Sequence, residues 1–148
     1  MSRLPQVAGV FTAMEVAASG LTAERGRMNL IASNLANAHT TKGADGNPYR
    51  RVDPLFVGKS INKNSFDPVL RQISEVRLAG TRTDTSPGQL VYDPSHPDAN
   101  PQGYVEYPNV NVVTEMVNLM TASRAYEAGV TSIESIKSMA RSALKIGQ

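Results

Sequence analysis

Apolar residues recur at alternating steps of three and four positions along the first part of the chain. This spacing places them on one side of an α-helix, as a narrow seam of the kind that pairs with another helix. Pro5 stands where the first turn of a helix tolerates proline, and Gly43 favours an end to the helix. We therefore predict an N-terminal helix within residues 1–40. Its seam is Val7, Val10, Met14, Ala17, Leu21, Glu24, Met28, Ile31, Leu35 and Ala38, of which only Glu24 is not apolar.

The same spacing returns at the other end of the chain and predicts a C-terminal helix within residues 109–148. Asn111 is a candidate N-cap, and Glu115 would lie in the first turn, where the helix dipole favours a carboxylate. Lys145 suits the last turn. The second seam is Val112, Met116, Leu119, Ser123, Tyr126, Val130, Ile133, Lys137, Ala140 and Leu144.

Proline separates these two regions. Eight of the nine prolines lie between Gly43 and Pro108, and an interior proline costs a helix about 3 kcal/mol. Residues 41–108 are therefore predicted to form turns and short strands. Candidate strands are residues 48–52 and 54–57, separated by proline, and residues 73–78, 89–92 and 104–107. The fold class expected is mainly α: long N- and C-terminal helices packing as a coiled-coil-like pair, with a small β or extended, proline-rich middle region.

Each seam is too narrow to stabilise a long helix by itself, so the two seams must bury each other or meet neighbouring chains. Gly20, Gly26 and Gly129 allow two interpretations. They either permit close contact between helices or only weaken them, by about 1 kcal/mol each relative to Ala.

Composition excludes several classes of function. The chain contains no Cys, so disulfides, thiolate nucleophiles and Cys-bound zinc are excluded. A net charge of +2, no Trp and no basic run argue against nucleic-acid binding. No apolar stretch reaches the roughly 20 residues that span a bilayer. Glu15 interrupts the N-terminal apolar run, which disfavours a cleaved signal peptide.

Two polar segments are candidate sites of chemistry. Residues 93–98 (Asp-Pro-Ser-His-Pro-Asp) combine a hydroxyl, an imidazole and two carboxylates, but neighbours in a proline-rich loop rarely converge as a catalytic or metal site. A rigid surface turn is the simpler interpretation, and we expect no enzyme, no metal site and no cofactor. Lys42, Arg50 and Arg51 suggest either a solvated loop or a contact with acidic groups of a neighbouring subunit.

The two ends of the chain resemble a known family. Residues 31–41 contain Ser33-Asn34-Leu35-Ala36-Asn37-Ala38-His39-Thr40, which resembles the N-terminal signature of bacterial flagellar rod, hook and hook-associated proteins. Residues 109–117, followed by residues 123–128 (Ser-Arg-Ala-Tyr-Glu-Ala), are similar to the C-terminal signature of the same family. Residues 47–51 and 91–98 narrow the resemblance to subunits of the proximal rod.

This resemblance implies a structural role in the basal body, in the rod that crosses the periplasm and transmits torque. Implied partners are other flagellar rod proteins, copies of the chain itself, adjacent membrane-ring and export-gate proteins, and the flagellar type III export apparatus, which exports such subunits without a cleaved signal. Neither nucleic acid nor a small-molecule substrate is expected.

Polymerisation would then proceed through the terminal helices. The subunit-interface residues expected are Val7, Val10, Met14, Leu21, Met28, Ile31, Asn34, Leu35, Asn37, Val112, Met116, Leu119, Tyr126, Val130, Ile133 and Leu144. Two alternatives stay open: another flagellar rod- or hook-type axial subunit, and a soluble helical adaptor or chaperone.

Overall fold

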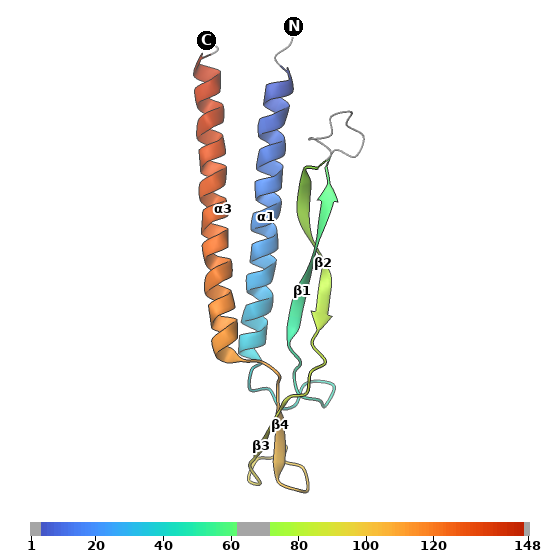
Figure 1. Cartoon of the computed structure of the whole chain (residues 1–148). Helices are drawn as coiled ribbons and strands as arrows, with labels where there is room; N and C mark the ends of the chain where they lie inside the picture. Colours follow the sequence, from blue (N-terminus) through green and yellow to red (C-terminus); the bar gives the residue numbers. More distant parts are fainter. Residues whose placement is uncertain (1–3, 62–71, 147–148) are drawn as a thin grey trace. The chain divides into compact units, whose positions relative to one another are not determined.

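A computed structural model of the chain describes residues 4–61 and 72–146. Its elements, in chain order, are the helix α1 (Leu4–Ala36), the strands β1 (Val52–Ser60), β2 (Ser74–Thr83), β3 (Gln89–Tyr92) and β4 (Tyr104–Tyr107), and the helix α3 (Val112–Ile146) (Figure 1). Both predicted helices are present, and they are the longest elements. The strands, of up to 10 residues, take a larger share of the chain than a mainly α fold implies. The fold is therefore two long helices with short antiparallel strands between them in sequence.

The strands form two separate two-stranded sheets, β1 with β2 and β3 with β4. The second is antiparallel, with Gln89 opposite Tyr107 and Tyr92 opposite Tyr104. The expectation that proline would divide the first strand region was wrong, because β1 continues through Pro54. A two-stranded sheet has a free edge on each strand, and an edge position tolerates a residue without an N–H donor.

Local hydrogen bonds explain where the helices meet the intervening segments. Asn111 caps α3 as predicted, since its side-chain oxygen accepts from the Thr114 amide at 3.0 Å and its carbonyl accepts from the Glu115 amide at 2.9 Å. At the end of α1, the side-chain Nδ2 of Asn37 donates to the Ser33 carbonyl at 2.9 Å. The same carbonyl also accepts from the backbone amide of Asn37 at 3.1 Å, so Asn37 holds the end of α1 with two hydrogen bonds.

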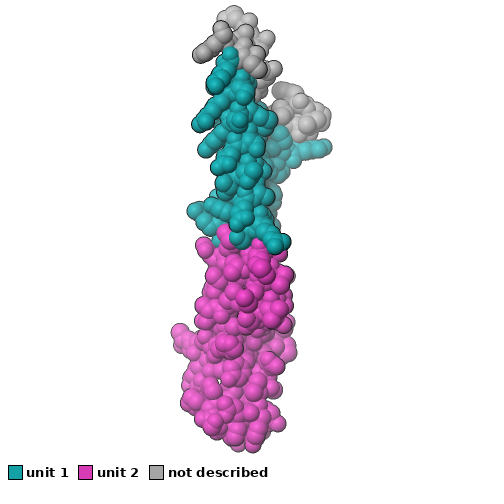
Figure 2. All heavy atoms as spheres, turned by 90° about the vertical axis from the view of Figure 1, so that its left-hand side faces the viewer, with its two compact units in different colours: residues 1–26, 56–79, 122–148 teal, residues 27–55, 80–121 magenta. Residues whose placement is uncertain are grey.

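The chain divides into two compact units (Figure 2). Unit 1 comprises residues 1–26, 56–79 and 122–148, and unit 2 comprises residues 27–55 and 80–121. The division crosses both helices and both long strands, so each unit contains a piece of α1, a piece of α3 and pieces of β1 and β2. The two units are defined by contacts between residues that are distant in sequence, so neither unit coincides with one of the three regions predicted from the sequence.

Small side chains dominate the buried apolar core of the described residues. The buried apolar residues are Ala23, Ile31, Ala38, Val105 and Ala122. Three buried residues, Asn34, Glu75 and Glu115, are polar or charged. Apolar burial is the main favourable term in folding, so a core this small leaves a large part of the stability to specific polar contacts or to further partners.

Neither helix, over the ranges that the structure describes, carries an apolar stretch long and uncharged enough to cross a lipid bilayer.

One glycine of α3 lies at a close contact between the helices of unit 1. A Cβ atom added at Gly129 would lie only 2.7 Å from Cδ2 of Leu21, on α1. A Cβ added at Gly20 would meet nothing within 4 Å. The two interpretations of the glycines therefore apply to different positions: Gly129 permits close packing, whereas the space around Gly20 does not require glycine.

We expect Gly20→Ala to stabilise the helical state by about 1 kcal/mol, because Ala has the higher helix propensity and its methyl group meets no neighbour. Gly129→Ala should gain much less or destabilise, because Leu21 must move aside. Thermal unfolding of the two variants, followed by far-ultraviolet circular dichroism, makes the comparison. Equal stabilisation by both substitutions would contradict the close contact at Gly129.

Candidate functional site

The side chain of Asn34 is the centre of a buried polar cluster in unit 2. Its Nδ2 donates to the Val52 carbonyl at 3.0 Å and to Oε2 of Glu115 at 3.1 Å. Its Oδ1 accepts from the Tyr49 hydroxyl at 2.9 Å and from the Val52 amide at 3.0 Å. A side-chain amide has two donors and two acceptor sites, so Asn34 uses its full capacity while only 1% exposed. One side chain thus connects α1, β1 and the first turn of α3.

Glu115 and Arg51 extend this cluster with charge. Glu115 is 1% exposed, and its Oε1 accepts from Nε of Arg51 at 2.8 Å. The Arg51 Nη1 donates to Oδ2 of Asp53 at 2.8 Å. Burial alone would lower the pKa of Arg51, but its hydrogen bond to Glu115 and the charges of Glu115 and Asp53 outweigh it, so the pKa lies above its usual value. The guanidinium therefore remains charged and compensates a carboxylate that is buried away from water.

The loop before α3 is attached to the same cluster. The Arg51 amide donates to Oδ1 of Asn109 at 2.8 Å, and Nδ2 of Asn109 donates to the carbonyls of Asp84 and Ser86. Arg50 donates to the Ser86 carbonyl at 2.7 Å and forms an ion pair with Glu106 at 2.8 Å. Hydrogen bonds from Ser86 lower the pKa of Asp84 below its usual value. Polar contacts therefore run without a break from the end of α1 to the start of α3.

These contacts correct the interpretation of the basic residues. Arg50 and Arg51 were expected either in a solvated loop or against a neighbouring subunit, and both instead pair with carboxylates of the same chain. Sequence reasoning assigned Glu115 to the helix dipole alone and missed its burial. A signal was available, because Asn34 and Glu115 each stand inside one of the two signature segments.

The expected interface residues on α1 are mostly buried or half-buried within the chain itself. Ile31 and Asn34 are buried, whereas the side chain of Val7 lies outside the described part of the chain. The remaining ones are half-buried: Val10, Met14, Leu21, Met28, Leu35 and Asn37. The α1 seam therefore packs largely against other parts of its own units.

On α3 the expected interface residues separate into two groups. Leu119, Tyr126, Val130 and Ile133 are half-buried. Val112, Met116 and Leu144 are exposed. The half-buried group occupies the middle of the α3 seam, so only the two ends of the seam are open to a partner. The assignment of all seven residues to a subunit interface stays a prediction.

A different set of α3 residues forms an exposed apolar stripe in unit 2. Its members are Val113, Met116, Val117 and Met120, which are between 52% and 72% exposed. They stand at positions i, i+3, i+4 and i+7, so they share one face over two helical turns. Only Met116 belongs to the predicted seam. We refer to these four residues as the apolar stripe.

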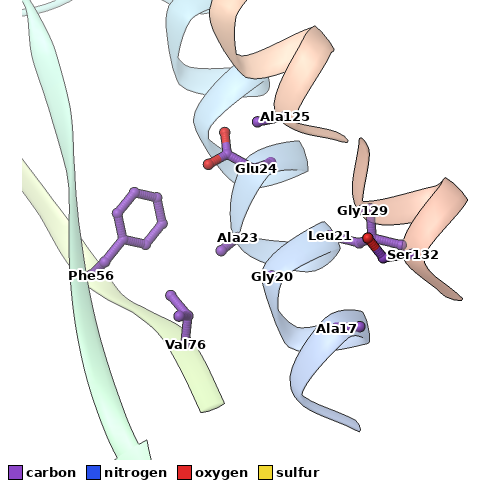
Figure 3. A pocket seen from close by; sticks show the side chains of 10 residues that line it. All are labelled: Ala17, Gly20, Leu21, Ala23, Glu24, Phe56, Val76, Ala125, Gly129 and Ser132. Carbon is purple, nitrogen blue, oxygen red and sulfur yellow. The ribbon is translucent and has the colours of Figure 1, made fainter. Parts of the chain in front are cut away.

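Unit 1 contains a groove of about 380 Å³. Figure 3 shows Phe56 of β1 and Val76 of β2 on one side of α1, while the remaining side chains come from α1 and α3. The Val76 amide donates to Oγ of Ser19 at 3.1 Å, which attaches β2 to α1 in this unit. The groove is lined by Ala17, Gly20, Leu21, Ala23, Glu24, Phe56, Val76, Ala125, Gly129 and Ser132. Small residues on two helices therefore leave a mainly apolar hollow.

The polar loop at residues 93–98 has the hydrogen bonds of a surface turn. Oδ1 of Asp93 accepts from the hydroxyl and the amide of Ser95, and these bonds lower the pKa of Asp93. Nδ1 of His96 accepts from the Asp98 amide at 3.1 Å, and the Asp98 carboxylate accepts from the Thr41 hydroxyl at 2.8 Å. Within residues 4–61 and 72–146, no three His, Cys, Asp or Glu side chains gather as metal ligands.

Comparisons with known proteins agree at both ends and over most of the chain. A family model described as flagella basal body rod protein matches residues 14–44. A second, described as flagellar basal body rod FlgEFG protein C-terminal, matches residues 102–146. Asn34 lies in the first match and Glu115 in the second, so their hydrogen bond joins the two matched segments.

Individual relatives are similar over almost their full length. The flagellar basal-body rod protein FlgC of Borreliella burgdorferi is 45% identical over 95% of this chain and 99% of its own. That of Bacillus subtilis is 41% identical over 93% and 98%, and that of Salmonella typhimurium is 41% identical over 90% and 95%.

Replacing Asn34 should destabilise the chain far more than replacing Asn37 in the same turn region. Asn34→Ala leaves several buried groups without hydrogen bonds and should cost about 3 kcal/mol. Asn37→Ala removes local bonds to Ser33 and Thr40 and should cost about 0.5 kcal/mol. Urea unfolding of both variants makes the measurement.

A third variant separates hydrogen bonding from shape. Asn34→Asp keeps the size of the side chain but turns an oxygen toward the Glu115 carboxylate, so it should be at least as disruptive as Asn34→Ala. If Asn34→Asp and Asn37→Ala unfolded at the same urea concentration, the polar cluster would not organise unit 2.

Proposed function

The chain belongs to the family of the flagellar basal-body rod protein FlgC, and on this premise we propose that it is a subunit of the proximal rod that polymerises through its terminal helices and transmits torque. A member of this family is a structural component of the rod and assembles with other rod components. The position in the proximal rod, the helical interface and the mechanical role are the proposed steps. The proposed role is structural and not catalytic.

The apolar stripe on α3 is the observation that carries the proposal. Val113, Met116, Val117 and Met120 expose more than half of each side chain on one helix face. Leaving this much apolar surface in contact with water is unfavourable, at roughly 25 cal/mol for each Å² that could be buried. A contiguous apolar row of this kind is typical of a surface that another protein covers.

The small core supports the same proposal. Among the residues that the structure describes, the largest buried apolar side chains are Ile31 and Val105, whereas many large apolar residues are exposed on the helices and on β1, β2 and β3. A free chain of this kind therefore leaves much apolar surface in contact with water. Neighbouring subunits would complete the core, and a lattice with several neighbours per subunit can transmit torque through packing alone.

The proposed partners follow from this assembly. They are copies of the chain and other rod proteins along the shaft, together with membrane-ring and export-gate proteins where the rod begins. Delivery through the flagellar type III export apparatus, without a cleaved signal, is part of the proposal, as is a final location in the rod that crosses the periplasm.

Near-full-length identity of 41–45% to FlgC proteins favours a proximal rod subunit over another rod- or hook-type axial subunit. The adaptor or chaperone alternative requires a helical protein that is stable by itself, and the small core argues against that.

A charge in the apolar stripe should prevent assembly. In a host that lacks its own copy of the gene, the intact chain should restore motility on soft agar and complete rods in electron micrographs of basal bodies. Met116→Asp should abolish both, because it places a carboxylate in the interface while leaving the half-buried seam of α1 intact. Leu35 and Tyr126 are less informative targets, since both are half-buried within the chain.

Thr114→Asp is the matched control. Thr114 is exposed in the same region of α3, on a different face from the apolar stripe, and its replacement adds the same charge. It should keep motility near that of the intact chain. Normal swimming with Met116→Asp would exclude the stripe as an assembly surface, and complete rods in cells without the gene would argue against the rod function itself.

A further inference from the structure

We propose that the apolar stripe of one copy of the chain docks into the unit 1 groove of a second copy. This inference rests on the proposed function and names the contact through which successive subunits are joined.

The groove has the size and lining of a site for apolar side chains. Its volume of about 380 Å³ falls within the roughly 300–1,000 Å³ of protein pockets that hold guests. Phe56 and Val76 line it and are each 39% exposed, so apolar wall remains open to a guest. On the helix side, Gly20 has free space around it, so a neighbouring chain can approach the α1 backbone closely.

The stripe has the properties that such a guest requires. Its four side chains extend over about 10 Å of helix, at 1.5 Å per residue. Two of them, Met116 and Met120, are flexible thioethers, which adapt to irregular apolar surfaces better than branched side chains do. A short helical row can therefore enter a hollow that is not shaped as a single deep pocket.

Charge agrees with this pairing. The groove contains one carboxylate in its lining, that of Glu24. Between residues 112 and 121, α3 exposes no acidic side chain, and Arg124 is exposed one turn after Met120. Glu127 is exposed further along the same helix, so it is the exposed charge nearest the stripe, that of Arg124, that is opposite in sign to the carboxylate of the groove.

The stripe and the groove are different surfaces of the same chain. A contact between two different surfaces is heterologous, and when it is repeated it extends into an open helical assembly instead of closing as a dimer. A stable interface usually buries about 800 Å² on each partner, more than four side chains provide. The stripe therefore fixes the register of neighbouring subunits within a larger interface.

Cysteine cross-linking tests this contact directly, because the chain contains no Cys. Met120→Cys labels the stripe, and Ser132→Cys labels the groove. Both variants are first checked for restored motility. They are then expressed alone or together in the host that lacks the gene, and assembled basal bodies are oxidised and separated on non-reducing gels.

Each variant alone should remain monomeric, and the two together should give a covalent dimer. A chain that carries both substitutions should give a ladder of multimers. The matched control is Ser138→Cys, another exposed serine on α3 that does not line the groove and lies six residues from Ser132. The pair of Met120→Cys and Ser132→Cys should give about ten times more dimer than the pair with Ser138→Cys, because a disulfide needs Cα atoms within roughly 7 Å.

Two results would overturn the inference. A covalent dimer formed by Met120→Cys alone would mean that the apolar stripes of two copies contact each other. Complete rods and normal motility without a dimer from the mixed pair would mean that the groove is not the acceptor, while the rod function stands. Failure of the intact chain to build rods would instead count against the proposed function.

Discussion

The hydrogen bonds of the Asn34 side chain are the constraint on which unit 2 depends. A single amide within α1 satisfies both polar groups of the Val52 backbone, the Tyr49 hydroxyl and the Glu115 carboxylate. Because all four bonding positions are used, α1, β1 and the start of α3 can meet in only one register. The buried carboxylate of Glu115 then requires a cation, and Arg51 provides it. The arrangement of the elements in unit 2 therefore depends mainly on directional hydrogen bonds and an ion pair, and less on the burial of apolar side chains.

This division of roles leaves apolar surface available for assembly. Most buried apolar residues of the described chain are alanines, and the larger ones are displayed on α3 and on the strands. A compact monomer would be expected to bury those side chains first. A subunit whose final environment includes several neighbours can instead use polar contacts to hold its own fold and apolar contacts to join others. The stripe and the groove fit that arrangement, as two unlike surfaces of one chain.

Sequence patterns predicted much of the fold and less of the sites. The spacing of apolar residues located both helices, Asn111 was identified as the cap of α3, and β3 and β4 coincide with the candidate strands at residues 89–92 and 104–107. The same spacing did not separate positions that face the chain's own helices from positions that face outward. Leu35 and Tyr126, expected at an interface, are half-buried, whereas Val113 and Val117, outside the seam, are exposed. A seam records which residues share a face, but not what covers it.

The amino-acid sequence by itself determined the helical ends, the proline-rich segment between them and the family signatures, because these depend on local propensity and on short motifs. Only the tertiary structure decided that Asn34 and Glu115 meet, that Arg50 and Arg51 pair inside the chain, and that Gly129 receives Leu21. Each of these contacts joins residues more than 50 positions apart. No local pattern encodes such a pairing, since it follows from how the helices and strands are brought together in space.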